Sequence, residues 1–241
     1  GVLLSPTLGE DERSTITWNY PGPIGKIVVD FGVTGDVRGM TRAKSLMDEV
    51  SSEAEIYGDT GSLQMMRFNS KQLLSNGNCE APLMDAVADL CYFYSVSEQL
   101  ETDMYIAVGF NPDPENPVNI CQGIMLQAMP DCDHEALDRL RKTLNSEAFK
   151  KLINTKTEDV EILFKELLTG EDSALEYELY PCNEPHFKCT CSREKTMNVL
   201  STLGPADVKD IVAKGDNVNV ACHFCSKLYS FTPDEVKNVV G

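Results

Sequence analysis

Four cysteines near the C-terminus constrain the fold of this chain more than any other feature. Cys189 and Cys191 form a C-x-C pair. Cys222 and Cys225 form a C-x-x-C pair after thirty intervening residues. Each pair can place two sulfurs on one side of a tight turn, so together they supply the four thiolates of a tetrahedral structural zinc site. With all four positions filled by protein there is no open position for a catalytic water, which disfavours zinc hydrolysis chemistry.

The sixty residues from Cys182 to the C-terminus contain few large apolar side chains. A domain this small usually needs a cross-link or a metal, and a structural zinc site contributes roughly 10–16 kcal/mol in small peptides. We therefore predict zinc as the cofactor, held by Cys189, Cys191, Cys222 and Cys225. His223, inside the C-x-x-C turn, is an alternative ligand that the four cysteines make unnecessary.

The negative charge of such a zinc site also needs basic groups nearby to offset it. Four thiolates around one divalent cation leave a net charge of about −2. Four basic side chains lie close in sequence and either offset that charge or are simply solvated, namely Lys188, Arg193, Lys195 and Lys227.

The cysteine pattern leaves three functions open. The first is an inert zinc ribbon on an interaction protein, which the pattern alone favours, and the second is a redox switch in which oxidation removes the ligands. The third is a thiol-disulfide oxidoreductase that uses Cys222 and Cys225. A thioredoxin-like site expects its C-x-x-C at the start of a helix that follows a strand, whereas here the motif follows NVNVA near the end of the chain.

The chain has nine cysteines, and an odd number cannot all pair internally. That count and the length of 241 residues disfavour a secreted disulfide scaffold. The five other cysteines have no spacing partner and are predicted to be core thiols, with Cys91 on a buried helix face and Cys121 in a strand. They are Cys79, Cys91, Cys121, Cys132 and Cys182.

The net charge of −17 disfavours a nucleic-acid partner, because such binding depends on Lys and Arg neutralising phosphates. Seven basic and seven acidic residues follow position 181, so the whole acidic excess lies in residues 1–181. No apolar run approaches membrane-spanning length, so we expect no membrane partner and a cytoplasmic protein. The chain does not begin with Met, which leaves a eukaryotic organelle open if a targeting segment has been removed.

The sequence predicts an α+β fold. Alternating apolar residues predict strands in STITWNY, KIVVDFGV, AEIYG and SLQMMRF, with a turn at Asn76-Gly77. A helix of about four turns is expected from Pro82, with Leu83, Leu90 and Cys91 on one face. MYIAVGF and VNICQGIMLQAM then predict two strands.

Residues 134–169 read as short amphipathic helices, with a capping box at Thr155-Lys-Thr-Glu158. In the tail, glycines 204 and 215 are expected to end two helices, and Thr232 with Glu235 to cap a third. We predict an N-terminal core domain at 1–131, a helical linker at 132–181 and a zinc-binding domain at 182–241.

The residues carry a family resemblance. The strings FKCTCSRE (187–194), QGIMLQAMP (122–130), YSVSEQLETDMYI (94–106) and GDVRG (35–39) occur in an order that resembles the heat shock protein 33 family of redox-regulated chaperones. The resemblance runs from about Thr15 to the C-terminus. Members of that family carry a further segment ahead of the first strands, so this chain is expected to start internally.

The resemblance implies an ATP-independent holdase rather than an enzyme. In such proteins the four matching cysteines hold zinc in the reduced, inactive form, and oxidants convert the pairs to disulfides. Cys189, Cys191, Cys222 and Cys225 would then be both ligands and redox-active residues. The tail and linker would unfold, and the protein, as a homodimer when oxidised, would bind unfolding client proteins.

The resemblance also suggests a function for the predicted linker helices, which is to cover apolar surface until the zinc is lost. We expect residues 134–169 to pack on the first domain while the tail is docked. Loss of zinc would free their apolar faces and the surface beneath them for nonnative chains.

Overall fold

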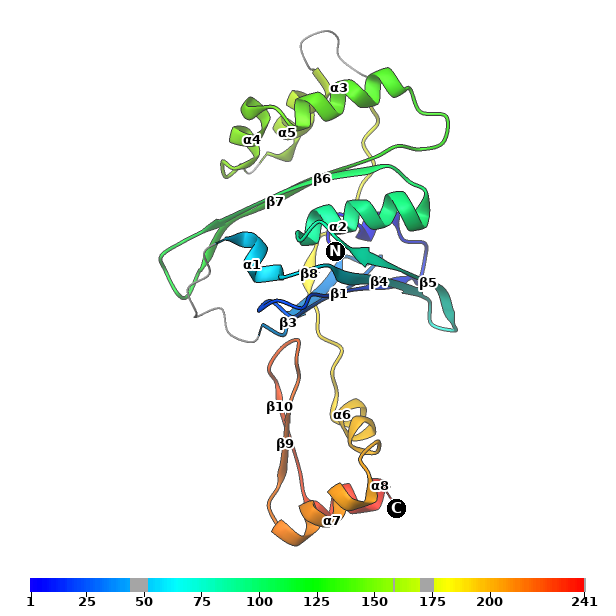
Figure 1. Ribbon diagram of the computed structural model, residues 1–241, viewed down its shortest axis with the longest axis vertical. Helices are drawn as coiled ribbons and strands as arrows, with labels where there is room; N and C mark the ends of the chain where they lie inside the picture. Colours follow the sequence, from blue (N-terminus) through cyan, green and yellow to red (C-terminus); the bar gives the residue numbers. More distant parts are fainter. Residues whose placement is uncertain (44–51, 158, 170–175, 241) are drawn as a thin grey trace.

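The computed structural model describes residues 1–43, 52–157, 159–169 and 176–240. Three parts follow one another along the long axis (Figure 1). A β-sheet lies in the middle, three helices lie at one end, and the C-terminal tail lies at the other end. The α+β fold predicted from the sequence is confirmed.

The central sheet has six strands in the order β5-β4-β1-β2-β3-β8. All neighbours are antiparallel except β3 and β8, which run parallel. The predicted strands in STITWNY, KIVVDFGV and SLQMMRF are confirmed as β1, β2 and β4. The bounds are β1 (Arg13–Asn19), β2 (Lys26–Gly32), β3 (Asp36–Thr41), β4 (Gly61–Phe68), β5 (Leu73–Ala81) and β8 (His186–Phe187).

Alternation along β1 places Ile16 and Trp18 in the main core, where both are buried. Helix α2 (Ala86–Phe93) covers this face and continues into a π-turn at Tyr94–Glu98. The helix begins later than Pro82, because the carboxylate of Asp85 accepts hydrogen bonds from two backbone N–H groups of the first turn. Leu83 consequently lies outside the helix and is exposed.

Two local predictions for the first domain are wrong. AEIYG forms a short helix, α1 (Glu53–Tyr57), because its adjacent apolar residues have no two-residue period. The predicted turn at Asn76-Gly77 lies inside β5 instead. Gly77 is required there by packing, since a Cβ atom would lie only 2.8 Å from the ring of Phe93.

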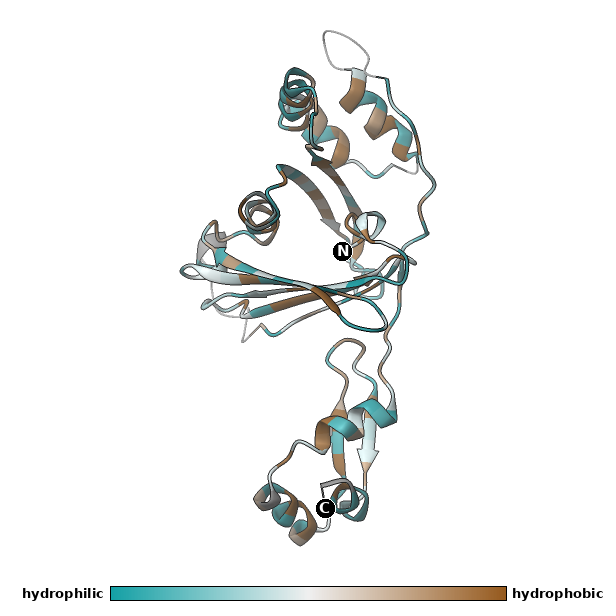
Figure 2. Cartoon of the chain, turned by 90° about the vertical axis from the view of Figure 1, so that its right-hand side faces the viewer, coloured by the Kyte–Doolittle hydropathy of each residue, from teal (hydrophilic) through white to brown (hydrophobic). Residues whose placement is uncertain are grey.

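The two predicted strands after α2 form a hairpin of β6 (Thr102–Phe110) and β7 (Val118–Gln127). The predicted linker helices are α3 (His134–Leu144), α4 (Glu147–Ile153) and α5 (Val160–Thr169). Apolar and polar residues alternate along these helices (Figure 2). Their apolar faces pack on the hairpin in a second core of Ala107, Ile124, Leu144, Phe149, Ile153, Leu163 and Leu167.

The predicted capping box at 155–158 is not found at Thr155. Its hydroxyl donates to the carbonyl of Lys151 at 2.9 Å and so ends α4 rather than beginning α5. Glu158, the other half of that box, lies outside the described residues.

The tail contains α6 (Arg193–Leu200), α7 (Pro205–Lys214), the hairpin β9 (Val218–Ala221) and β10 (Leu228–Phe231), and α8 (Pro233–Val240). Gly215 ends α7 in the left-handed region at φ 70°, as predicted. Gly204 does not end α6 but precedes α7, where its N–H donates to Asp207. The cap of Thr232 and Glu235 is confirmed. The buried side chains of the tail form a third core, which consists of Leu200, Val208, Tyr229, Phe231 and Val236.

A buried ion network joins β1, β2 and β3. Arg13 pairs with both Asp30 and Asp36, and Arg38 Nε lies 3.3 Å from Asp30 Oδ1. Burial raises the pKa of Asp36, but hydrogen bonds from Thr34 and Arg13 outweigh it and lower this pKa to about 2 from 3.8. The ionised carboxylate therefore stabilises the folded sheet at neutral pH.

We predict that Asp36→Asn lowers the free energy of unfolding by about 2 kcal/mol at pH 7. Because the folded pKa is depressed, this contribution is present above pH 3.8 and is lost as pH falls through about 2. The difference between variant and wild type should therefore shrink on acidification. Urea unfolding followed by fluorescence of the single tryptophan, Trp18 in β1, measures it. The exposed Glu147→Gln is the control, and a difference independent of pH would contradict the prediction.

Candidate metal centre

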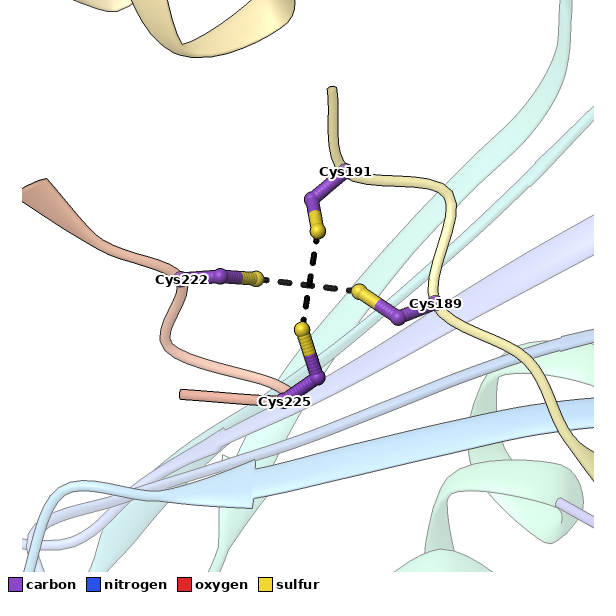
Figure 3. A group of neighbouring side chains, drawn as sticks. All are labelled: Cys189, Cys191, Cys222 and Cys225. Carbon is purple, nitrogen blue, oxygen red and sulfur yellow. Dashed lines mark hydrogen bonds between the residues drawn. The ribbon is translucent and has the colours of Figure 1, made fainter. Parts of the chain in front are cut away.

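The four cysteines singled out in the sequence meet in one cluster. Their Sγ atoms all lie within 4.8 Å of one another. Cys189 and Cys222 are separated by 3.6 Å between sulfurs, and Cys191 and Cys225 by 3.5 Å. Figure 3 shows the four side chains converging on one point from two segments of the chain.

These distances fit a tetrahedral metal and exclude a disulfide in this state. A disulfide bond is about 2.05 Å long, and all nine cysteines are free thiols. Zinc–sulfur bonds of about 2.3 Å in a tetrahedron place the sulfurs about 3.8 Å apart. The donor set, four cysteines and no carboxylate, is that of a structural zinc site.

Local backbone structure presents the sulfurs. The hairpin of β9 and β10 pairs Ala221 with Leu228, which leaves residues 222–227 as a turn that we call the knuckle. The N–H of Cys222 donates to the carbonyl of Lys227 at 2.9 Å and closes it. On the other segment, the hydroxyl of Ser192 caps α6 directly after Cys191. Both cysteine pairs are therefore held by adjoining regular structure.

A cation from the first domain reaches the cluster. Arg38 of β3 donates from Nη1 to the sulfur of Cys189 at 3.7 Å, and its guanidinium lies 4.3 Å from the ring centroid of Phe224 in the knuckle. Arg42 Nη2 lies 3.5 Å from Nε2 of His223. Tyr229 donates its hydroxyl to the sulfur of Cys191 at 3.1 Å. The centre is thus shared between the tail and the sheet.

Three of the four basic residues that could either offset the charge or be solvated contact groups other than the sulfurs. Arg193 donates to Ser230 O and Glu235, and Lys195 Nζ donates to Thr190 O at 3.0 Å. Lys227 Nζ lies 5.5 Å from the ring centroid of Tyr229. Within the described part of the chain, the cation in contact with a sulfur is Arg38. The sequence did not reveal this contact, because 151 positions separate Arg38 from Cys189.

The thiols differ in acidity. Burial raises the pKa of Cys189, but hydrogen bonds from the backbone of Cys191 and from Arg38 outweigh burial and lower this pKa to about 6. The backbone N–H of Lys227 lowers the pKa of Cys225, yet burial and the three neighbouring thiols raise it to about 12. The hydrogen bond to Cys191 raises the pKa of Tyr229 to about 12. Four thiolates therefore need a divalent cation among them at neutral pH.

The remaining predictions for cysteines and histidine have mixed outcomes. His223 lies beside Arg42 and outside the sulfur cluster. Cys121 is exposed, so its assignment as a core thiol is wrong. It lies on the face of β7 opposite Ile120 and Ile124, which pack toward the linker helices. Cys182 is also exposed, while the other three cysteines of that set are half-buried.

The structural context disfavours the oxidoreductase alternative. Cys222 follows β9, but the chain from Cys225 continues into strand β10 rather than into a helix. A thioredoxin-like motif needs a helix N-terminus to stabilise its reactive thiolate.

Comparison with known families agrees with this geometry. The sequence model of the family described as Hsp33 protein matches residues 1–232. The chain belongs to the Hsp33 family.

Relatives of this Hsp33-family chain support the assignment. It is 26% identical over 245 residues to the 33 kDa chaperonin of Staphylococcus carnosus, covering 99% of this chain and 81% of that protein. It is 27% identical to the 33 kDa chaperonin of a Geobacillus species, with the same coverage. The crystal structure of a 33 kDa chaperonin, a heat shock protein 33 homolog from Thermotoga maritima, superposes with a TM-score of 0.77 at 25% identity, over 99% of this chain and 81% of that one.

These findings confirm the family resemblance, and the relatives' names support a chaperone. In the described residues, no helix has the length and apolar character needed to cross a bilayer.

We predict that Cys222→Ser abolishes stable zinc binding by this Hsp33-family chain. Three thiolates remain, so after dialysis against a chelator we expect less than about one tenth of the wild-type zinc, together with loss of tail helicity. Elemental analysis and circular dichroism measure both. Cys182→Ser is the matched control, since that thiol is exposed and outside the cluster. Full zinc retention by the Cys222 variant would refute the assignment.

We further predict that Arg38→Met weakens zinc binding by about 10- to 100-fold, the usual effect of losing a group that contacts a metal ligand. Arg38→Lys should lie between, because it keeps the charge but not the planar contact with Phe224. Competition with a chromophoric chelator under reducing conditions gives the affinity. Arg42→Met, directly after β3, is the control because Arg42 lies beside His223 rather than beside a sulfur. An equal effect in both variants would show that Arg38 has no specific role.

Proposed function

We propose that this chain is a redox-regulated, ATP-independent chaperone, a holdase that binds unfolding proteins under oxidative stress. The observation that carries the proposal is the cluster of four free thiols, which joins the segment after β8 to the knuckle. Removing the metal from such a cluster releases two segments of the chain at once. Membership of the Hsp33 family supports the same function.

In the reduced state, Cys189, Cys191, Cys222 and Cys225 would hold zinc, which supplies a structural cross-link and no catalytic position. The small third core of the tail then stays folded. The helices α3–α5 remain packed on the hairpin of β6 and β7 through the second core. The inner apolar face of α3–α5 is covered in this form, so it is inactive toward clients.

Oxidation removes the ligands. Each pair of zinc-bound thiolates gives up two electrons and forms one sulfur–sulfur bond, while one molecule of hydrogen peroxide takes those electrons and two protons from solvent and becomes two molecules of water. Disulfide sulfurs no longer ligate zinc as thiolates do. The lost binding energy, roughly 10–16 kcal/mol, matches or exceeds the net stability of about 5–15 kcal/mol of a whole domain. The tail then unfolds.

The linker helices and the tail lie at opposite ends of the sheet (Figures 1 and 2). Coupling between them therefore runs along the connecting segment, residues 176–185, rather than through direct contact. The side-chain amide of Asn183 fastens this segment to the carbonyl of Val33 at 2.9 Å. Unfolding of the tail would free the segment and lower the barrier to releasing α3–α5, whose inner face carries Phe149 and Ile153.

Several finer features belong to the proposal. The division into a core domain (1–131), a linker (132–181) and a zinc-binding switch domain (182–241) is retained, with β8 of the last part paired to the sheet of the first. Clients are unfolding proteins, and the oxidised form is a homodimer. We propose a cytoplasmic location, with no nucleic-acid or membrane partner and no enzymatic activity.

We predict that only the oxidised form suppresses aggregation. A chemically unfolded test protein is diluted into buffer with this chain either zinc-loaded and reduced or treated with peroxide at mildly raised temperature, and light scattering is followed. Suppression by the oxidised form alone supports the switch. Equal scattering with both forms would mean that the zinc has a structural role only. Reduction of insulin by the chain would support an oxidoreductase instead.

A further inference from the structure

The outer edge of β3 is the place where the tail meets the sheet. Only two residues of β8 pair with it, His186 with Asp36 and Phe187 with Val37. The N–H of His186 donates to the carbonyl of Gly35 at 2.9 Å, and that of Lys188 donates to the carbonyl of Val37 at 3.2 Å. The edge therefore already accepts a short extended segment.

This contact is made by backbone groups and not by side chains. Phe187 is 61% exposed, and the ring of His186 lies against the carbonyl of Glu184 in its own segment. An edge that binds a segment through its peptide groups alone does not select for sequence.

The part of the edge beyond β8 presents polar backbone groups, and within the described residues no strand covers them. Arg42 donates its N–H inward to the carbonyl of Lys26, so the even-numbered residues of β3 face β2. The peptide groups of Val37, Gly39 and Thr41 consequently point outward. Beyond Val37, no strand of the described chain pairs with this side.

In the folded state the knuckle stands beside this edge. Phe224 contacts Arg38, and His223 contacts Arg42, both on β3 or directly after it. β8 and the knuckle are thus fixed near β3 by the same sulfur cluster, since β8 ends two residues before Cys189. Two residue pairs are too few to hold β8 once the tail unfolds.

We propose that the outer edge of β3, from Asp36 to Thr41, is a client-binding site that takes an extended segment of an unfolding chain as an added strand. The inference rests on the proposed function and specifies how clients are held. Edge strands with unpaired peptide groups bind extended chains in this way, and unfolding proteins expose such segments whatever their sequence.

Charge argues for a client rather than a second copy of this chain. Antiparallel pairing of two β3 edges centred on Met40 would set Arg38 of one copy opposite Arg42 of the other, and like charges directly opposite destabilise a strand pair.

Residue-resolved amide exchange on the full-length oxidised chain tests the site. The probe is reduced, carboxymethylated α-lactalbumin, which is permanently unfolded. We expect the outward amides of Val37, Gly39 and Thr41 to exchange at least about tenfold more slowly with the probe bound. The inward amides of Arg38 and Met40 are an internal control and should be protected with and without it.

Binding of the probe without slower exchange at the outward amides would overturn the β3 site and leave the holdase function standing. Failure of the oxidised chain to bind the probe at all would overturn both.

A pair of variants at Gly39 gives a second test. Gly39→Pro removes the outward N–H and should weaken probe binding about tenfold, with zinc release on oxidation unchanged. Gly39→Ala keeps that N–H, and its Cβ fits at 3.4 Å from the nearest atom, so it should bind as wild type. Equal affinity in a folded Gly39→Pro variant would contradict the proposal.

Discussion

The convergence of four sulfurs within 4.8 Å is the constraint on which the arrangement of this molecule depends. Among the described residues, the core of the tail has five buried apolar side chains, which is small for an independent domain. Its two cysteine pairs come from segments with no shared regular structure. A metal among them would close the tail on itself and, through the adjoining β8, anchor it to the sheet.

Electrostatic attraction at the same centre also connects the tail to the sheet. A tetrathiolate around a divalent cation carries a charge of about −2. Arg38 of β3, which also pairs with Asp30 of the buried ion network, brings a guanidinium to Cys189. Disulfide formation would abolish that negative charge. Under the proposed function, oxidation would then remove both the internal cross-link of the tail and its attraction to β3.

The site was predictable from the sequence where the determinants are local. The spacing of Cys189, Cys191, Cys222 and Cys225 predicted that their sulfurs would meet, because a tight turn brings each pair together, and the four sulfurs do lie in one cluster. The linker helices were predictable from their strong period. Arg38 was not, because its position beside Cys189 depends on the pairing of β3 with β8. The same holds for Gly77, whose place inside β5 is decided by the ring of Phe93.

Removing the metal without oxidation tests directly whether zinc keeps the tail folded and docked on the sheet. Reduced, zinc-loaded chain is treated with a strong chelator in the presence of a thiol reductant, and amide exchange is followed in the tail and in β8. We expect protection to be lost in α6–α8 and at His186 and Lys188, while Trp18 and its neighbours in the sheet stay protected. A tail that remains folded and docked after its metal has been removed would contradict it.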